Sequence, residues 1–451
     1  MKKTPFFALA FAIPAAFAAA GVWDAAELRG KTDSDPVGYA VGQKMKFTIS
    51  LVGADAAELP GDAKVKWRRR GDDGVDFSGE APASAVAAEP IEIETSLDRP
   101  GFVRVSAEVV EPDGTKARRL PPEGKDKGES VSFEGGAGAA VAELRAGPEP
   151  ADFVEYWKRQ KEILAAVPVT AERVEIESRD PAVRQYAVSV ACAGKRPVTG
   201  ILSIPVAADR GEKFPAEVTF HGYGTHVQRT SWVSHRAILF NVNAHGYDLL
   251  RDDQYYEDFF ASIRTEKDGK KYNYAFDPDQ NASPDTAYFH DMALRVVRAF
   301  DYVRTLPEWD GKGLIASGGS QGGLQTMWAA GLVDGLVEAR PGITWCCDFA
   351  GLRDGRLKGG WHIPYSPAME YFDPVHHAAH VPTTCKVDIV RAGLGDYTCP
   401  PSGLAVLYNS IPGPKKIHWV QGSTHGYVPQ FEENQVVDLS SGWPVEDGAA
   451  E

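Results

Sequence analysis

Residues 313–332 read GLIASGGSQGGLQTMWAAGL and carry the strongest structural signal in the chain. The first part, Gly313 to Ala316, is a short apolar run of the kind that forms a buried strand, and the last part, Leu324 to Leu332, has helical spacing. Between them lies Gly318-Gly319-Ser320-Gln321-Gly322, in which glycines leave room for a strained strand-to-helix turn. Ser320 is therefore the candidate nucleophile.

This Gly-x-Ser-x-Gly motif is weak evidence by itself. With 45 glycines in 451 residues, the motif is expected to occur by chance roughly a few tenths of a time in a chain of this length. The alternative is a glycine-rich loop with an ordinary serine. The flanking strand and helix favour the nucleophile, and a base must then follow, because a serine hydroxyl is a poor nucleophile without one.

A base and an acid follow Ser320 in the order that α/β-hydrolases use. His425 lies in Gly422-Ser423-Thr424-His425-Gly426, just after the last predicted strand, 416–420. Asp396 ends Gly393-Leu394-Gly395-Asp396, after the preceding strand, 386–391. Each has a plain alternative: Asp396 could cap the next helix, and His425 could be a surface histidine. Together the three predict a Ser-His-Asp triad.

Two other carboxylates compete with Asp396 for the role of acid. Asp388 lies inside the predicted strand, where its side chain points along the sheet rather than out of its carboxyl end. Asp373 precedes Pro374 and has the pattern of a turn residue. Asp396 is the better candidate.

The oxyanion hole requires two aimed backbone amides. One is expected from Gln321, directly after the nucleophile. The other is expected from Tyr223, in His221-Gly222-Tyr223-Gly224 after the predicted strand 216–220. The His221 side chain is expected to be structural.

The region 148–440 alternates strand-like and helix-like segments. This alternation predicts an α/β fold, the α/β-hydrolase fold, with a mostly parallel central sheet flanked by helices. The expected strands are 183–191, 198–204, 216–220, 237–242, 313–316, 386–391 and 416–420, and the expected helices are 151–167, 285–306, 324–332 and 402–409.

Residues 22–145 have a different pattern. Short runs with period-2 alternation are separated by turn residues, which predicts a small all-β domain of the immunoglobulin-like sandwich type. Gly135 to Gly147 is rich in glycine and alanine and is expected to be a linker, so a chain starting near Pro148 should keep activity on a small ester. The expected strands are 44–51, 63–68, 91–96, 101–110 and 129–133.

The first 20 residues have the layout of a signal peptide: Lys2 and Lys3, an apolar run, then small residues at 18–20. The alternative is a buried N-terminal helix. The layout predicts export to the periplasm or the exterior. Its removal changes the net charge from −14 to −16, which disfavours nucleic acid and anionic membranes as partners and suits a neutral substrate. No later apolar stretch is long enough to span a membrane.

Metal or other cofactor binding has little support in the sequence. None of the five cysteines forms a Cys-x-x-Cys pair, so buried, inert thiols are expected. His376, His377 and His380 are closely spaced, as zinc ligands can be, but no matching cysteine or carboxylate pattern accompanies them. Exposed loop histidines are the commoner case, and no cofactor is expected.

Several motifs together resemble the acetyl xylan esterase / cephalosporin C deacetylase family over about residues 150–435. They are Tyr156-Trp157-Lys158, Phe220-His221-Gly222-Tyr223, Gly318-Gly319-Ser320-Gln321-Gly322-Gly323, Gly393-Leu394-Gly395-Asp396 with Pro400-Pro401-Ser402, and Thr424-His425-Gly426-Tyr427. The resemblance implies metal-free deacetylation of small acetylated sugars. Residues 22–145 lie outside it.

Two departures from the family pattern leave the substrate preference and any homo-oligomer open. Asn243-Ala244-His245-Gly246 stands where the family has Arg-Gly-Gln, and Gly426 stands where it often has Glu. Three aromatic residues, Trp232, Trp361 and Tyr365, are either sugar-stacking or core residues.

The leading hypothesis is an exported serine esterase that hydrolyses acetyl esters of carbohydrate through an acyl-enzyme. A serine peptidase of the prolyl-oligopeptidase type shares the fold and triad order, but 22–145 is too short for a propeller. A third hypothesis is a non-catalytic glycan-binding protein.

Overall fold

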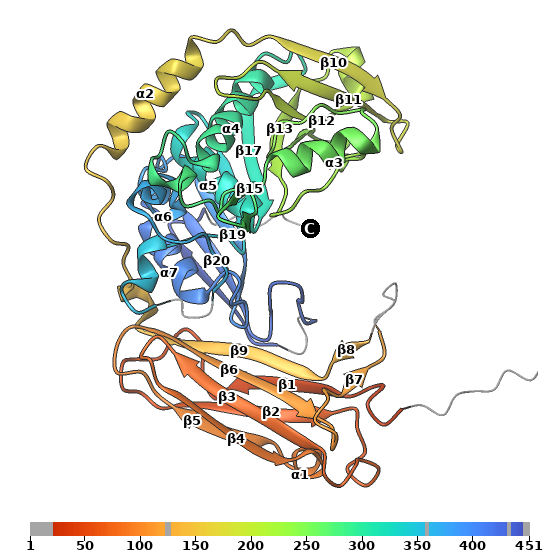
Figure 1. The fold of residues 1–451 in the computed structure, drawn as a ribbon, viewed down its shortest axis with the longest axis vertical. Coiled ribbons are helices and arrows are strands. Elements are labelled where there is room, and N and C mark those ends of the chain that lie inside the picture. Colours follow the sequence, from red (N-terminus) through yellow and green to blue (C-terminus); the bar gives the residue numbers. More distant parts are fainter. Residues whose placement is uncertain (1–20, 122–127, 357–359, 431–433, 445–451) are drawn as a thin grey trace, which may run out of the picture.

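The computed structural model describes residues 21–121, 128–356, 360–430 and 434–444. The expected signal peptide, 1–20, lies outside the described residues. Figure 1 shows two bodies, one in which helices flank a large sheet and one built almost wholly of strands. We call them the C-terminal body (residues 153–441) and the N-terminal body (residues 21–139). Within the described chain, no helix is long and apolar enough to cross a membrane.

The C-terminal body is organised by a ten-stranded mixed sheet. Its six central strands, from β14 to β20, are parallel to one another, and antiparallel pairs extend the sheet at both edges. In sheet order the strands are β10 (Ala171–Ile176), β11 (Val183–Val190), β12 (Val198–Pro205), β14 (Ile238–Val242), β13 (Phe214–Phe220), β17 (Trp309–Gly319), β18 (Glu338–Gly342), β19 (Lys386–Gly393), β20 (Lys415–Val420) and β21 (Val436–Ser441).

Amphipathic or wholly apolar helices bury the faces of this sheet. Helix α5 is buried on nearly all sides, because its residues are apolar or small around the whole circumference. Helix α4 buries most of its length, including Phe289 and Phe300. The helices are α2 (Phe153–Ala165), α3 (Asp253–Ser262), α4 (Tyr288–Arg304), α5 (Gln321–Leu332), α6 (Pro374–Ala379) and α7 (Pro401–Ser410), and a small hairpin, β15 (Thr265–Lys267) and β16 (Lys270–Tyr272), lies between α3 and α4 in sequence.

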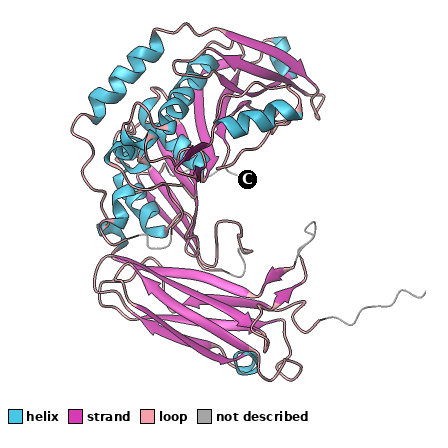
Figure 2. Ribbon diagram, viewed as in Figure 1, coloured by secondary structure: helices cyan, strands magenta, loops and turns pink. Residues whose placement is uncertain are grey.

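The N-terminal body contains two antiparallel sheets whose side chains share one buried apolar cluster, including Phe47, Ile49, Val103 and Val105. It is not built of strands alone, since a short helix, α1 (Ala83–Ala88), interrupts it (Figure 2). One sheet is β1 (Glu27–Thr32), β2 (Met45–Val52) and β5 (Ile91–Thr95); the other is β4 (Asp76–Pro82), β3 (Lys64–Gly71), β6 (Gly101–Val110) and β9 (Ser132–Ala139); β7 (Arg118–Arg119) pairs with β8 (Glu129–Ser130).

The segment expected to be a linker, 135–147, differs from that expectation. Its first residues belong to β9, which pairs with β6 and is almost completely buried. The glycines are there because the C-terminal body comes close: a Cβ on Gly136 would lie 2.8 Å from the Leu394 carbonyl oxygen. The small residues therefore mark a tight interface between the bodies, not a flexible spacer.

Candidate active site

Ser320 sits in the turn between β17 and α5, at the carboxyl end of the parallel strands. Its φ of 59° and ψ of −120° are strained for a residue with a side chain. Two backbone hydrogen bonds hold it there: its N–H donates to the Gly342 oxygen at 2.9 Å, and its oxygen accepts from the Trp345 N–H at 3.1 Å. The surrounding strands thus maintain the strained turn at Ser320, which is 8% exposed.

The glycines of the motif are required by close packing. A Cβ on Gly322 would lie 2.2 Å from the Phe220 oxygen, and one on Gly318 would lie 2.7 Å from the same atom. A Cβ on Gly323 would meet the Gly342 oxygen at 2.9 Å. Helix α5 can start this close to β13 and β18 only because these positions carry no side chain.

Asp396 and His425 lie together after β19 and β20. The Asp396 carboxylate is fully buried, and its Oδ2 is 3.0 Å from His425 Nδ1. Its Oδ1 accepts hydrogen bonds from the backbone N–H groups of Thr398 and Cys399, both at 3.0 Å. The carboxylate is therefore fixed from one side and directed at the imidazole from the other, which leaves His425 Nε2 as the nitrogen that can exchange a proton.

A buried thiol belongs to the same group of atoms. Cys399 Sγ, an Asp396 oxygen and a His425 ring nitrogen all lie within 4.8 Å of one another. Burial raises the pKa of the Cys399 thiol well above its usual value, although the Ser320 hydroxyl acts to lower it. A thiol that keeps its proton is a poor metal ligand. In the described part of the chain no hydrogen bond joins Ser320 to His425.

The loop after β13 lies opposite the nucleophile, since a Cβ on Gly222 would be 3.9 Å from Ser320 Cβ. The His221 ring shapes this loop: Nδ1 donates to the Gly222 oxygen at 2.7 Å and Nε2 accepts from the Ala244 N–H at 3.1 Å. Burial lowers the pKa of His221, so the ring is neutral. Tyr223 follows directly in this loop, one residue after the close approach of Gly222 to Ser320.

A tyrosine that the sequence did not single out connects both oxyanion candidates. The Tyr274 hydroxyl accepts from the Gly224 N–H at 2.9 Å and donates to Gln321 Oε1 at 2.8 Å. Its ring stacks on the Tyr223 ring with centroids 4.2 Å apart. Burial raises the pKa of Tyr274, so the phenol keeps its proton. One hydroxyl therefore ties the Tyr223 loop to the residue after Ser320.

The segment that departs from the family pattern, 243–246, supports the same loop. His245 Nε2 donates to the Gly224 oxygen at 3.0 Å, and Nδ1 accepts from the Tyr288 hydroxyl at 2.9 Å. Burial lowers the pKa of His245 to about 3, so this imidazole is also neutral. In the segment that stands where the family has Arg-Gly-Gln, His245 thus holds the Gly224 backbone by a hydrogen bond.

Aromatic rings form a wall beside Tyr223. Trp361 stacks on the buried Trp345 with centroids 4.8 Å apart, and it meets the Tyr223 ring edge-to-face at 4.9 Å. Trp361 also stacks on Phe276 with centroids 5.7 Å apart, and its residue is 42% exposed. Of the three aromatic residues singled out in the sequence, Trp361 has this contact with Tyr223, whereas Trp232 and Tyr365 are exposed and have none.

The competing carboxylates have other partners. Asp388 Oδ1 is 2.9 Å from His418 Nε2. Asp373 is fully buried and accepts from the backbone N–H groups of Asp348 at 2.9 Å and Phe349 at 2.6 Å. Burial raises the pKa of Asp373 to about 7. Neither carboxylate has a described contact with His425.

The three clustered histidines do not converge on one point. His376 binds the Glu370 carboxylate at 2.8 Å. His377 binds the backbone carbonyl oxygen of Tyr371 at 3.1 Å, and His380 binds the Glu149 carboxylate at 2.7 Å. Glu370, Asp373 and His376 are close enough to share an ion, but His376 Nε2 is committed to Glu370.

All five cysteines are free, and Cys192 is half-buried while the others are buried.

Comparisons with known proteins point to one family. The model of the acetyl xylan esterase family matches residues 143–357 and 366–442. A curated relative, acetyl esterase Axe7A of Xylanibacter ruminicola, is 27% identical over an alignment of 301 positions that covers 61% of this chain and 65% of the relative. The chain thus spans a little under two thirds of that relative's length.

Two solved structures share the fold of the C-terminal body. Acetyl xylan esterase from Paenibacillus sp. R4 has a TM-score of 0.53 at 21% identity and covers 65% of this chain and 95% of its own. Acetyl xylan esterase 1 from Thermoanaerobacterium sp. JW/SL YS485 has a TM-score of 0.52 at 18% identity, with 65% and 94% covered. Residues before 143 lie outside the family match.

Proposed function

The chain belongs to the acetyl xylan esterase family, whose members are carboxylic ester hydrolases, and from this premise we propose that it is a serine esterase that removes acetyl groups from carbohydrate. The observation that carries the proposal is the buried Asp396 paired with His425 at the same sheet edge as the strained Ser320. Acyl transfer needs a serine in a strained strand-to-helix turn, an imidazole oriented by a hydrogen bond, and a carboxylate that is buried from water.

The proposed reaction has two halves. Ser320 Oγ attacks the acetyl carbonyl while His425 Nε2 takes its proton, and Asp396 stabilises the imidazolium that forms. The oxyanion accepts hydrogen bonds from the Tyr223 and Gln321 amides. The sugar alcohol then leaves with the proton from His425, and acetyl-Ser320 remains. Water attacks this ester with His425 again as base, which releases acetate and restores the serine.

An uncharged sugar fits the surroundings of the site. The partly exposed Trp361 ring offers an apolar surface on which a sugar ring can pack, next to the loop that carries Tyr223. The chain's net charge of −14 disfavours polyanions and favours a neutral substrate. We propose an acetylated sugar or oligosaccharide of the xylan type.

The organisation that surrounds the site is part of the proposal. Residues 1–20 act as a signal peptide, and the mature chain is exported to the periplasm or the exterior. Residues 22–145 form an immunoglobulin-like unit ahead of the catalytic unit at 148–440. Mass spectrometry of the mature N-terminus in a secreting host tests export. A mature chain that still begins at Met1 would contradict it.

Release of acetate from acetylated xylan, and of p-nitrophenol from its acetate ester, tests the activity directly. We expect both with wild type, and essentially none with Ser320→Ala, whose folding is checked by its melting temperature. A fluorophosphonate should label Ser320. Peptidase activity without acetate release, or sugar binding without any hydrolysis, would replace the esterase with one of the other two hypotheses.

A further inference from the structure

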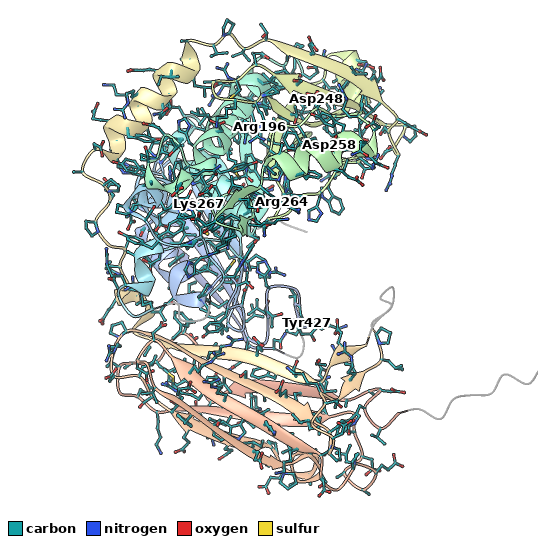
Figure 3. All side chains as sticks on the ribbon, in the orientation of Figure 1. Arg196, Asp248, Asp258, Arg264, Lys267 and Tyr427 are labelled. Carbon is teal, nitrogen blue, oxygen red and sulfur yellow. The ribbon has the colours of Figure 1, made fainter. Side chains whose placement is uncertain are left out.

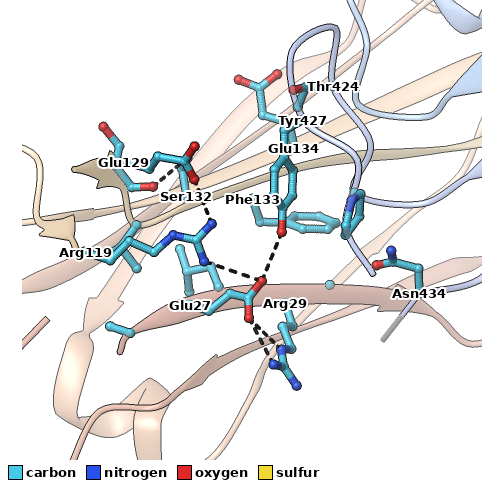
Figure 4. Close-up of a pocket in the computed structure, with 17 residues that line it drawn as sticks. Glu27, Arg29, Arg119, Glu129, Ser132, Phe133, Glu134, Thr424, Tyr427 and Asn434 are labelled. Carbon is cyan, nitrogen blue, oxygen red and sulfur yellow. Dashed lines mark hydrogen bonds and ion pairs between the residues drawn. The ribbon is translucent and has the colours of Figure 1, made fainter. Parts of the chain in front are cut away.

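A cavity of about 290 Å³ lies where the two bodies meet. One wall comes from the N-terminal body, with Glu27 on β1, Arg119 on β7 and Ser132 on β9. The other comes from the loop after β20, with Thr424 and Tyr427. Figure 4 shows Tyr427 reaching across to Glu27, and Figure 3 shows Tyr427 between the bodies.

This cavity adjoins the catalytic base through a single tight turn. The Thr424 N–H donates to the backbone carbonyl oxygen of Tyr427 at 2.9 Å. His425 and Gly426 therefore form the tip of the turn between these two residues. Residues on either side of His425 therefore line the cavity, while His425 itself pairs with Asp396. Thr424 and Tyr427 thus join the wall of the cavity to the turn that carries the proposed base.

The groups in the cavity are held in fixed orientations. Arg119 binds Glu129 at 2.8 Å and lies 3.8 Å from Glu27, whose other oxygen binds Arg29 at 3.0 Å. The Tyr427 hydroxyl donates to Glu27 at 3.3 Å. Side chains of Glu27, Arg119 and Glu129 keep 20 to 25% of their surface exposed, so they can still meet a ligand.

This chemistry matches a neutral molecule rich in hydroxyl groups. Carboxylates accept and guanidinium groups donate, so together they can satisfy neighbouring hydroxyls. The acids and arginines of the wall nearly balance in charge, which gives no preference for an ion. The Tyr427 ring lines the cavity beside these polar groups, with the Arg119 guanidinium 5.9 Å from its centroid.

We propose that the cavity is a subsite for unacetylated sugar units of the polymer whose acetylated unit reacts at Ser320. The inference rests on the proposed carbohydrate esterase function. It gives the N-terminal body a role as one wall of the substrate site, so that polymer is preferred over small esters.

Two variants and one control test the subsite. Arg119→Gln removes the charge that organises Glu27 and Glu129, and Ser132→Phe fills the cavity without breaking an ion pair. The control is Arg99→Gln, an exposed arginine of the same body that pairs with Asp98. Each is assayed for turnover of p-nitrophenyl acetate and acetylated xylan, and for calorimetric binding of unacetylated xylohexaose.

We expect both variants to raise KM for acetylated xylan at least fivefold and to abolish xylohexaose binding. Their kcat/KM for p-nitrophenyl acetate should stay within twofold of wild type, and the control should match wild type throughout. Unchanged KM for the polymer in both variants, or no xylohexaose binding by wild type, would overturn the subsite. Equal losses on both substrates would also overturn it, because they would show a structural role. Failure of the esterase function itself would appear separately, as wild type that releases no acetate from xylan.

Discussion

Gln421 and Gly136 exchange two hydrogen bonds across the interface between the bodies. Gln421 Nε2 donates to the Gly136 oxygen at 2.8 Å, and the Gly136 N–H donates to Gln421 Oε1 at 2.9 Å. Gln421 directly follows β20 and lies four residues before His425. The side chain thus acts like an extra peptide group that pairs the end of β20 with β9, and it anchors the loop that carries the proposed base.

The first prediction concerns a chain that begins at Pro148. The linker expected from the sequence would leave such a chain active, but the structure leads to the opposite expectation. The loss of β9 and β6 would expose Trp419, which packs against Phe102 with centroids 5.3 Å apart. We expect an aggregating or largely inactive protein, with under about 1% of wild-type turnover of p-nitrophenyl acetate. A monomeric fragment with full turnover would show that the anchor of the His425 loop is dispensable.

The second prediction concerns Asp396. Asn at this position keeps the shape but favours the wrong imidazole tautomer, and the same change in the triad of a serine protease costs ~10⁴ in turnover. We expect a loss of that order in Asp396→Asn, with some activity returning at alkaline pH. The matched control is Asp388→Asn, whose carboxylate binds His418. If the control loses activity and Asp396→Asn loses less than about tenfold, the acid has been assigned to the wrong residue.

The third prediction concerns Tyr274 as a positioning residue. Tyr274→Phe keeps the stacked ring but leaves the Gly224 N–H and Gln321 Oε1 without their partner. Because the Tyr223 loop then loses its tie to Gln321, we expect kcat to fall about 10- to 100-fold with KM nearly unchanged.

Tyr288→Phe is the control for Tyr274→Phe. It removes the hydroxyl that donates to His245, which in turn binds the Gly224 oxygen, so it acts on the Tyr223 loop less directly. Its effect on kcat should be several-fold smaller. Equal losses in the two variants, or a change confined to KM, would argue against a specific role of Tyr274 in aligning the two amides.

The fourth prediction concerns stability at acid pH. Burial lowers the pKa of His377 to about 3, so between that value and 6.5 the unfolded chain binds a proton that the folded chain does not. Stability from this residue is therefore full above pH 6.5 and is lost as the pH falls. Over the interval from pH 6.5 to 5 the loss is about 2 kcal/mol.

His377→Gln should remove this part of the pH dependence. Buried Asp373 acts in the opposite direction, since its raised pKa makes the folded chain bind the extra proton between about pH 4 and 7. The useful quantity is therefore the difference between variant and wild type in the free energy of unfolding, measured in urea at pH 7 and pH 5. An equal drop in both proteins would mean that His377 does not titrate as its burial requires.

Local patterns in the sequence predicted the elements that carry the proposed chemistry. The apolar run before Ser320 lies in β17, and the helical run after it lies in α5. The glycines between them allow the close packing that the strand-to-helix turn at Ser320 requires. Asp396 and His425 follow parallel strands that end at one sheet edge, so their order along the chain was enough to place them together.

The strand between β17 and β19 could not be predicted from its residues. Strand β18 reads Glu338-Ala339-Arg340-Pro341-Gly342, and a proline argues against a central strand. The structure tolerates it through a shift in the pairing with β19 between Ala339 and Gly342. Tyr274 was missed for another reason: its partner Gln321 lies 47 residues away, and no local pattern encodes such a contact.

The bonds between Thr32 and Gln435 have a consequence for how the enzyme is made. Thr32 N and Oγ1 both donate to Gln435 Oε1, at 2.8 and 2.6 Å, and Gln435 Nε2 returns a bond to the Thr32 oxygen at 3.1 Å. A ribosome adds Thr32 403 residues before Gln435, and His425 lies ten residues before Gln435. A nascent chain can already hold Ser320 and Asp396, yet the segment that follows His425, the proposed base, can bind Thr32 only after residue 435 has been made. We therefore expect the order of synthesis to delay the docking of this segment on the N-terminal body until residue 435 has been made.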